Sequence, residues 1–323
     1  MTAWKETVGG RRALTILRSR PFLTVAIVAG VWIAASFASR GFGAYGHLRY
    51  LVELAAVIGL VAAGQTFVVI AGGIDLSVAA IVTVSAVSLP LLSWQADPTG
   101  LTAVLAVLAL TTTIGLVNGL GVALLRVHPM IMTLAMATFL QGLLIIIAGG
   151  SAVTAENPLV RWLGNARPAG IPAGVLLWLA VSVIVLTAMH ATSFGARLFA
   201  MGANPLAAAL SGVPVASTTL AVYGISGFTS GLAGVLVLGM NGQGYVGIGD
   251  PYLLASIAAV VLGGTSILGG LGTYAGTIPG AILLVTITAL ITVVNASPGW
   301  RSILFGSLIL GLLLLSGREQ ARR

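Results

Sequence analysis

The stretch 64–78 constrains the fold most, because it is an apolar run broken by two glycines and an acid. Gly72, Gly73 and Asp75 interrupt a run that is as rich in apolar residues as a membrane helix, and a second apolar run follows. A helix broken at membrane depth needs protein around its free backbone groups, and an ionisable side chain there marks a functional site. Asp75 or Ser77 would also cap the next helix by accepting hydrogen bonds from its first amide groups. The residues alone leave both roles open.

The composition identifies a polytopic membrane protein. Of the 323 residues, 58% are hydrophobic and 7% are charged, and the mean hydropathy is +1.09. The surface of a soluble domain could not carry this composition. The net charge of +8 would suggest nucleic acid as a partner of a soluble protein, but here the basic residues cluster at the termini and in a few loops, as membrane topology signals do. The chain has no cysteine, which excludes disulfides, thiolate catalysis and thiolate metal sites.

Ten apolar segments approach or exceed the roughly 20 residues needed to cross about 30 Å of hydrocarbon. We therefore expect a single all-α transmembrane domain over residues 1–323, with short or broken segments near 72–76 and 241–264. We interpret the first segment as a retained helix, because it lacks a convincing cleavage site and many spans follow. The ten segments are 22–39, 50–72, 76–93, 101–124, 130–149, 171–190, 216–240, 252–263, 274–294 and 301–316.

The distribution of lysine and arginine predicts the orientation of the chain. If the N-terminus is cytoplasmic, ten basic residues fall in cytoplasmic segments and five fall outside. Because basic residues are enriched in cytoplasmic loops, we expect both termini, the basic segment 1–20 and the loop 191–215 to lie in the cytoplasm.

The eighth segment is too short to cross a membrane unaided. Residues 252–262 cover about 17 Å at 1.5 Å per residue, and they follow a stretch rich in glycine. The segment ends at residues 263–266 (GGTS), which echo residues 72–75 (GGID). Broken segments at corresponding places in two halves point to a transport pathway, so we interpret the echo as the sign of an internal repeat.

Glycines on the seventh segment predict close helix packing. Gly224, Gly227, Gly231 and Gly234 are spaced three, four and three residues apart. This spacing puts them on one side of a helix, where a second backbone can approach.

The sequence GISG around Ser226 also matches the G-x-S-G pattern of the rhomboid intramembrane proteases. In that family the histidine partner follows the serine, whereas His47, His128 and His190 all precede Ser226. Helix packing therefore explains the motif better than an intramembrane hydrolase does.

The chain lacks the residues for nucleotide hydrolysis. A P-loop needs a lysine after its second glycine, and the only lysine is Lys5, so any ATP dependence must come from another subunit. Three scattered histidines without an H-E-x-x-H pattern give no recognisable metal site. Glu53 and Asp75 are the acids closest to the apolar segments, and they leave an ion-coupled secondary transporter open as an alternative.

The loop 191–215 contains start and stop signals for a short helix. Asn204 can cap this helix, Pro205 suits its first position, residues 206–210 favour helix formation and Gly212 can end it. A loop that only joined two spans could be shorter and more polar. We therefore expect a helix at 204–212 that lies across the membrane surface and serves for docking.

Four segments, in order and at suitable spacing, resemble permease subunits of bacterial sugar importers of the ribose, xylose and galactose type. Residues 64–78 resemble the signature G-x-T-x-V-x-x-x-G-G-I-D-L-S-V, and residues 258–270 resemble A-A-V-V-L-G-G-T-S-x-x-G-G. Residues 195–212 resemble G-x-N-x-x-A-A-x-x-S-G-I. Residues 118–119 and 126–134 resemble the family's N-G and P-F-I-V-T-L elements, with methionine at positions 130 and 132 where phenylalanine and valine are usual.

The resemblance implies a bacterial inner-membrane permease that passes a monosaccharide or polyol and works as an identical or related pair. It implies no catalytic residue, metal or cofactor in this chain, an ATPase subunit as the inner partner and a sugar-binding protein as the outer one. The loop 191–215 would be the coupling loop, whose helix enters a groove of the ATPase. A scaffold subunit without a pathway remains an alternative. The departures at 128, 130 and 132 leave the size and polarity of the substrate open.

The resemblance and the polar pattern together give two sets of candidate residues. The set for coupling to the ATPase is Arg197, Gly202, Asn204, Ala207, Ala208, Ser211 and Gly212. The set for the pathway or its gate is Gln65, Thr66, Gly72, Gly73, Asp75, Ser77, Asn118, Asn241, Gly263, Gly264, Thr265 and Ser266.

Overall fold

The computed structural model describes residues 20–38, 41–92, 97, 99–149, 151–293, 297 and 299–320. The predicted basic segment 1–20 lies outside this part of the chain except for its last residue. The described residues form helices α2 to α14, a short 3-10 turn η1 and two short strands. Their bounds are α2 Arg20–Ala38, α3 Tyr45–Ile70, α4 Val78–Leu92, α5 Leu101–Ala123, α6 Pro129–Ala148, β1 Val153–Thr154, α7 Pro158–Asn165, η1 Pro168–Gly170, α8 Ala173–His190, α9 Ser193–Ala203, α10 Pro205–Leu210, α11 Val215–Asn241, β2 Gln243–Gly244, α12 Pro251–Leu262, α13 Tyr274–Val293 and α14 Gly299–Gln320.

The predicted all-α membrane architecture is confirmed. Each of the ten predicted segments corresponds to one helix: α2, α3, α4, α5, α6, α8, α11, α12, α13 or α14. Six of these (α3, α5, α6, α8, α11 and α13) have at least 18 residues and are apolar enough to cross a membrane by length and composition. The predicted short segment is α12, with 12 residues.

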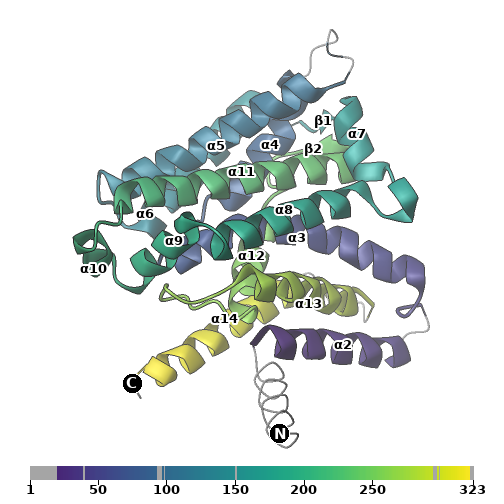
Figure 1. Cartoon of the computed structure of the whole chain (residues 1–323). Helices are drawn as coiled ribbons and strands as arrows, with labels where there is room; N and C mark the ends of the chain where they lie inside the picture. Colours follow the sequence, from purple (N-terminus) through teal and green to yellow (C-terminus); the bar gives the residue numbers. More distant parts are fainter. Residues whose placement is uncertain are drawn as a thin grey trace, which may run out of the picture.

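The helices differ sharply in how much of their surface the chain itself covers. In the most apolar 18-residue window, 89% of α3 and 78% of α11 is buried, but only 17% of α6. Helices α3 and α11 therefore form the centre of the bundle, and α6 presents most of its surface outward. Figure 1 shows α9 and α10 at one end of the bundle and α7, β1 and β2 at the opposite end.

The glycines of α11 allow the close packing that their spacing predicts. A Cβ atom on Gly227 would overlap the carbonyl oxygen of Thr111 on α5, and one on Gly231 would overlap the Thr111 side chain. A Cβ on Gly234 would lie 2.5 Å from the carbonyl oxygen of Val82 on α4. Helix α11 thus packs backbone to backbone against two neighbours, which is how helices associate in lipid.

The irregular stretch before α12 is held by backbone contacts at its buried residues, which are Gly244, Ile248 and Gly249, while Gly242, Gln243, Tyr245 and Asp250 are exposed. Strand β2 pairs antiparallel with β1, so that Val153 lies opposite Gly244. Further along, the amide of Gly249 donates a 3.1 Å hydrogen bond to the hydroxyl of Thr83 on α4. The predicted break near 241–264 is therefore confirmed as ordered backbone.

The ends of α3 and α12 have the same geometry. Gly72 and Gly264 have φ angles of +86° and +89°, a left-handed conformation that suits glycine. The two helix ends are equivalent with Gly72 matched to Gly264, one residue out of register with the echo between residues 72–75 and 263–266, and a repeat over the two halves stays a prediction. The matching amide-to-carbonyl pairs are Ala71–Phe67, Gly72–Val69 and Gly73–Val68 at the first end and Gly263–Ala259, Gly264–Val261 and Thr265–Val260 at the second.

The loop 191–215 holds two helices where one was predicted. Helix α10 starts as predicted, because the Asn204 side chain accepts a 3.0 Å hydrogen bond from the amide of Ala207 and Pro205 takes the first position. It ends at Leu210, slightly before the predicted end at Gly212. Helix α9 was not predicted, although Thr192 caps it in a similar way through the amide of Gly195.

The described loops do not decide the orientation of the chain. Arg126 and Arg197 lie at the α9–α10 end, whereas Arg49, Arg161 and Arg167 belong to the opposite end. The predicted excess of basic residues at the cytoplasmic side therefore depends on the residues near the termini, and the orientation stays a prediction.

Candidate functional site

Asp75 lies fully buried in the break between α3 and α4 and accepts hydrogen bonds on both carboxylate oxygens. Its Oδ1 accepts from the amide of Ser77 at 2.9 Å and from the Ser77 hydroxyl at 2.6 Å. Its Oδ2 accepts from the hydroxyl of Ser226 on α11 at 2.7 Å. The bonds from Ser77 are local and lie just before the start of α4, and the bond from Ser226 joins the break to α11, which is distant in the sequence. Asp75 thus combines a local turn with a tertiary contact.

Two further predicted pathway residues surround this acid. Asn118 on α5 donates from Nδ2 to the Ser77 hydroxyl at 2.9 Å. Gln65 on α3 faces the peptide unit of Asp75. When the side-chain amide is oriented to suit both contacts, its Nε2 donates to Asp75 O at 3.3 Å and its Oε1 accepts from Asp75 N at 3.3 Å. The structure therefore gathers Gln65, Asp75, Ser77 and Asn118, together with Ser226, into one buried cluster, which we call the Asp75 cluster.

Small residues let α11 approach this cluster. A Cβ on Gly64 of α3 would lie 2.5 Å from the Ser226 Cα atom, so the two central helices touch at this point. A Cβ on Gly73 would lie 2.8 Å from the hydroxyl of Tyr223, a side chain that is 2% exposed. Gly64 thus allows the backbone of α11 to approach α3, and Gly73 leaves room for the Tyr223 hydroxyl.

The two acids considered for ion coupling lie far apart. Glu53 forms an ion pair with Arg167, with 3.6 Å between Oε1 and Nη2, near the start of α3. Asp75 lies beyond the other end of the same helix and packs back against Gln65, which is 12 residues, or about 18 Å along the helix axis, from Glu53. Two carboxylates at this separation do not form a direct proton relay.

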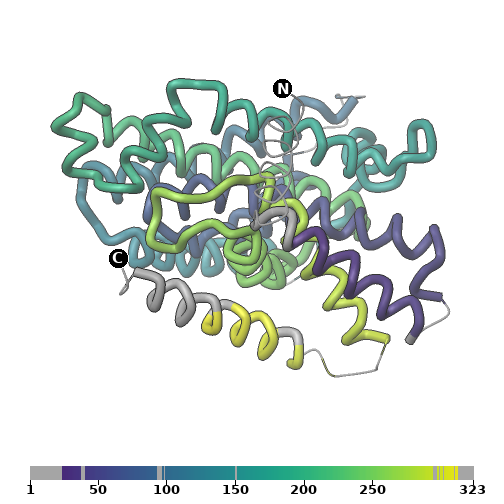
Figure 2. Tube along the Cα trace, turned by 60° about the horizontal axis from the view of Figure 1, so that its bottom comes forward, coloured from purple at the N-terminus to yellow at the C-terminus, as the bar shows by residue number. Residues whose placement is uncertain are grey.

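Helix α9 and the loop after α12 both approach the backbone at the end of α3, next to the first break. The amide of Gly270, in the loop after α12, donates a 2.9 Å hydrogen bond to the carbonyl oxygen of Ile70, the last residue of α3. A Cβ on Gly202 of α9 would overlap that same carbonyl oxygen, and one on Gly269 would lie 3.0 Å from the Cα of Gly72. We call this contact of three chain segments the glycine junction. The loop after α12 reaches toward the α9–α10 end in both views (Figure 1, Figure 2).

Helix α10 exposes its two leucines to the outside. Leu206 is 72% exposed and Leu210 is 83% exposed, and they lie one turn apart on the same side of the helix. Ala208 is 4% exposed and is buried by the chain itself, so the expectation that it supplies contact area for a partner is corrected. Leu206, and not Ala208, faces outward, and the sequence does not reveal this difference in burial. The remaining predicted residues of the loop that are exposed are Arg197, Asn204, Ala207, Ser211 and Gly212.

The other predicted pathway residues do not join the Asp75 cluster. Thr66 faces α13, where its hydroxyl lies 3.1 Å from that of Thr277. At the second break, Gly263 touches the backbone of Gly276, and the Ser266 amide donates to Leu271 O at 2.9 Å. Asn241 is exposed at the opposite end of the bundle, as the last residue of α11. The predicted set therefore divides among the Asp75 cluster, the α13 contact, the second break and the end of α11 instead of forming one site.

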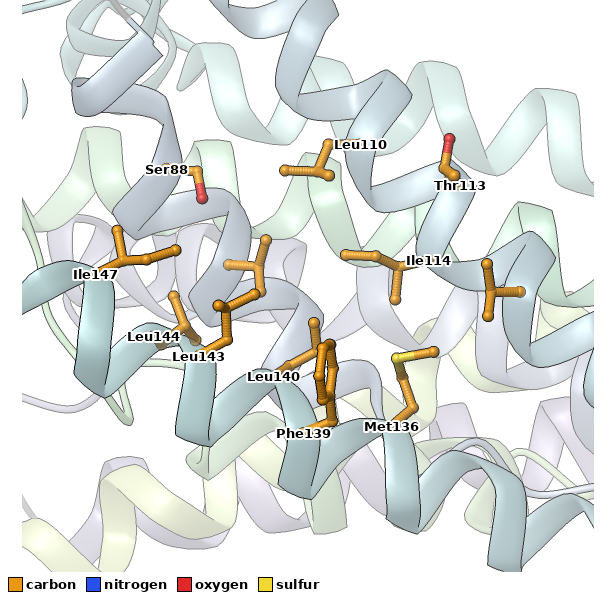
Figure 3. Close-up of a pocket in the computed structure, with 12 residues that line it drawn as sticks. Ser88, Leu110, Thr113, Ile114, Met136, Phe139, Leu140, Leu143, Leu144 and Ile147 are labelled. Carbon is orange, nitrogen blue, oxygen red and sulfur yellow. The ribbon is translucent and has the colours of Figure 1, made fainter.

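An apolar cavity of about 450 Å³ lies between α4, α5 and α6. Figure 3 shows its walls, in which Ser88 and Thr113 are the polar residues among leucine, isoleucine, valine, methionine and phenylalanine side chains. A site that binds a sugar needs several placed hydrogen-bonding groups, because buried hydroxyls without partners are costly. The chemistry of this cavity therefore does not suit a sugar.

Sequence reasoning missed two contributors to the site. The sequence predicts a packing motif around Ser226 and leaves an intramembrane nucleophile as a weaker alternative, and no hydrogen bond in the described part of the chain joins Ser226 to a histidine. Gly269 and Gly270 stand in the sequence only as part of the second signature segment. The signal for Ser226 is a hydroxyl within the glycine-lined face of α11, since small polar residues on such faces bond across helices.

Comparison with known proteins identifies the family. Residues 48–313 match the family model described as Branched-chain amino acid transport system / permease component. The chain belongs to this family. As a member of this permease family it is a multi-pass membrane protein with a transport role, which agrees with the six long apolar helices.

Curated relatives of this permease family match the chain over most of its length. The chain is 31% identical over 323 residues to the ribose import permease protein RbsC of Escherichia coli (strain K12), covering 98% of this chain and 99% of the relative. It is 32% identical over 278 residues to RbsC of Bacillus subtilis (strain 168), covering 85% and 86%. It is 31% identical over 308 residues to the L-arabinose transport system permease protein AraH of Escherichia coli (strain K12), covering 91% and 89%.

Proposed function

We propose that this chain is the membrane subunit of an ATP-driven importer that passes a monosaccharide or related polyol across a bacterial inner membrane. One observation carries the proposal. Helix α10 exposes Leu206 and Leu210, while the adjoining α9 is fixed to the end of α3 by the glycine junction. A docking face joined rigidly to a break in a central helix is what a subunit moved by a partner requires.

The partner at α10 is an ATPase subunit. The chain has no P-loop, so the free energy of ATP must enter through a contact surface. Two exposed leucines one turn apart can insert into an apolar groove, as helix-in-groove contacts do. Arg197 on α9 adds a cation that can pair with an acid of the partner. In this arrangement the α10 end, and both termini, face the cytoplasm.

The substrate is a neutral sugar. Relatives that align over most of the chain are named for ribose and L-arabinose, whereas the family description names branched-chain amino acids. A zwitterionic amino acid needs charged groups to bind its ammonium and carboxylate. The exposed part of α6 offers the neutral side chain of Gln141 near the middle of the span, which favours a sugar. A sugar-binding protein at the opposite end supplies most of the selectivity.

A second permease copy, identical or related, covers α6. This helix is 17% buried in its most apolar window, and the exposed Gln141 would be costly to leave in lipid. Against a second copy, the same face becomes one wall of a pathway with a polar group at mid-membrane. The apolar cavity beside it, between α4, α5 and α6, then lies on the flank of the pathway (Figure 3).

The test uses acidic substitutions on α10. We expect Leu206→Asp combined with Leu210→Asp to abolish co-purification of the ATPase subunit of the same transport system, because carboxylates enter an apolar groove at a high cost. The substitution Ile171→Asp, on an apolar residue that is 43% exposed at the opposite end, is the matched control and retains the ATPase. Full ATPase binding by the double variant would contradict the docking assignment.

Transport itself is measured in proteoliposomes that contain the permease, the ATPase and the sugar-binding protein. We expect uptake of radiolabelled D-ribose or L-arabinose that depends on ATP and stops without the ATPase. Uptake by the permease alone along a proton or sodium gradient would instead establish the ion-coupled alternative.

A further inference from the structure

The break between α3 and α4 is tied by side chains to three other helices. Ser226 ties it to α11 through Asp75, and Asn118 ties it to α5 through Ser77. The third tie is to α6: the Thr133 hydroxyl accepts a 3.1 Å hydrogen bond from the amide of Leu76. The same hydroxyl lies 3.2 Å from Ile74 O and 3.0 Å from the carbonyl of its own helix at position 129. Within four residues of chain, the break thus contacts α5, α6 and α11.

Two of these helices connect to the surfaces proposed above: α11 follows the docking helix α10, and α6 forms one wall of the proposed pathway. Helix α11 starts five residues after the end of α10, and its Ser226 lies 11 residues, or about 16 Å, from its first residue. Helix α6 is the most exposed of the six long apolar helices, and Thr133 lies in its second turn. A displacement of α10 therefore reaches Ser226 through one continuous helix and can reach α6 across two side-chain contacts.

The glycine junction holds the other side of the same break. Gly202 of α9 packs against the carbonyl oxygen of Ile70, and Gly270 in the loop after α12 bonds to the same oxygen, so α9 and α11, on either side of α10, both contact residues 70–77. A segment held by the helices on both sides of α10 moves with them when α10 is displaced. The contacts of Leu76 and Ile74 with Thr133 then transmit this movement to the start of α6.

We propose that Ser226 and Thr133 are positioning residues that transmit the movement of α10 to α6 through residues 74–77. This inference rests on the proposed function. The route is a chain of hydrogen bonds with buried, neutral hydroxyls at both ends, and exchange of one hydroxyl partner for another gives two discrete arrangements of a packed segment. A purely structural role for the two residues would stabilise the fold without linking ATP hydrolysis to transport.

The first test compares serines on the same helix. Ser226→Ala removes the bond to Asp75, whereas Ser230→Ala, one turn later, removes a buried hydroxyl that has no partner within the described structure. In proteoliposomes with the ATPase and the sugar-binding protein, we expect Ser226→Ala to raise the ATP hydrolysed per sugar taken up about fivefold, the effect of one lost hydrogen bond. ATPase binding stays at the wild-type level in both variants, and Ser230→Ala keeps the wild-type ratio.

The second test acts at the other end of the route. Thr133→Val should raise the same ratio, and Thr133→Ser, which keeps the hydroxyl, should restore it. Thr138→Val is the control, because the Thr138 hydroxyl bonds only within its own helix, to Leu134 O at 3.0 Å. The double variant of Ser226 and Thr133 should be no worse than either single one, since residues on one route are not additive.

A labelling experiment reads the movement of α6 directly. The chain has no cysteine, so Gln141→Cys introduces a unique thiol on α6. With the ATPase bound, we expect a non-hydrolysed ATP analogue to change the rate at which maleimide labels this thiol. Ser226→Ala should suppress that change, and Ser230→Ala should preserve it. An unchanged response and a wild-type ratio in Ser226→Ala, with the ATPase bound, would overturn the route alone. Failure of the wild-type chain to bind any ATPase would overturn the proposed function, and the route with it.

Discussion

Ser226 on α11 donates a 2.7 Å hydrogen bond to Asp75, which lies 151 positions earlier in the chain. Both residues are fully buried, and the bond links α11, which follows the loop 191–215, to the break between α3 and α4. The carboxylate also accepts two bonds from Ser77. A buried carboxylate is stable only when its oxygens are bonded, so Asp75 organises all of the groups that point at it.

Different substitutions of Asp75 should therefore lower the thermal stability of the protein by different amounts. Asp75→Ala leaves two hydroxyls and an amide without their acceptor, and each buried group left unpaired costs about 1–3 kcal/mol. Asp75→Asn keeps one acceptor oxygen for Ser77, and we expect a smaller fall in the midpoint of thermal denaturation in detergent. Equal midpoints for the two variants would show that the hydrogen bonds contribute little, and the cluster would lose its proposed importance.

Gly202→Ala tests the glycine junction. A Cβ atom at this position overlaps the carbonyl oxygen of Ile70, which is backbone and cannot turn aside. Overpacking of this kind typically costs about 1–3 kcal/mol, so we expect α9 to separate from the end of α3 and sugar uptake to fall while α10 still binds the ATPase. The control is Gly46→Ala on α3, where a Cβ has open space. Wild-type uptake by Gly202→Ala would mean that the junction is not needed.

Structural features that depend on a few neighbouring residues can be predicted from the sequence. Asn204 followed by Pro205 is a helix start that depends on a few adjacent residues, and α10 begins there. The apolar segments are equally local, and all ten become helices. Side-chain contacts across helices are not local. The partner of Asp75 could not be derived from spacing, because many hydroxyl residues occupy apolar segments and the pairing depends on how α11 packs on α3 at Gly64.

The same limit explains the correction at Ala208. Its residue type suits both a buried position and a contact surface, and a six-residue helix is too short for a periodic pattern to show which side faces inward. Only the packing of α10 against the rest of the chain turns Leu206 and Leu210 outward and Ala208 inward. Of the two alanines named from the sequence, Ala207 is exposed with the leucines and Ala208 is buried, and the role of this loop in coupling stays a prediction.

Tyr274→Phe tests a buried contact that joins three helices. The Tyr274 hydroxyl accepts from Trp178 Nε1 at 2.8 Å and donates to Gly59 O at 2.9 Å, so it joins α13, α8 and α3. Its loss leaves a buried indole N–H without an acceptor, and we expect destabilisation of about 2 kcal/mol. Tyr50→Phe, on a side chain that is 51% exposed, is the matched control with an unchanged thermal midpoint. A midpoint shift no larger than that of the control would show that water or another group replaces the lost hydroxyl.

Asp97 should make the start of α5 sensitive to acid. The hydroxyl of Thr102 donates to it at 2.5 Å, and together with bonds from Thr99 and Gly100 this holds the pKa of Asp97 below its ordinary value of 3.8. Because the pKa is lower in the folded state, the stabilisation is present above pH 3.8 and is lost as the pH falls from there toward the folded-state pKa. We expect deuterium exchange of residues 99–105 to be unchanged between pH 7 and 5, after correction for intrinsic rates, and to accelerate below pH 3.8. Asp97→Asn should remove this acceleration, and Thr102→Val should move the pH at which exchange accelerates closer to the ordinary pKa. If both variants show the same dependence of exchange on pH as the wild type, the acid sensitivity belongs to another group.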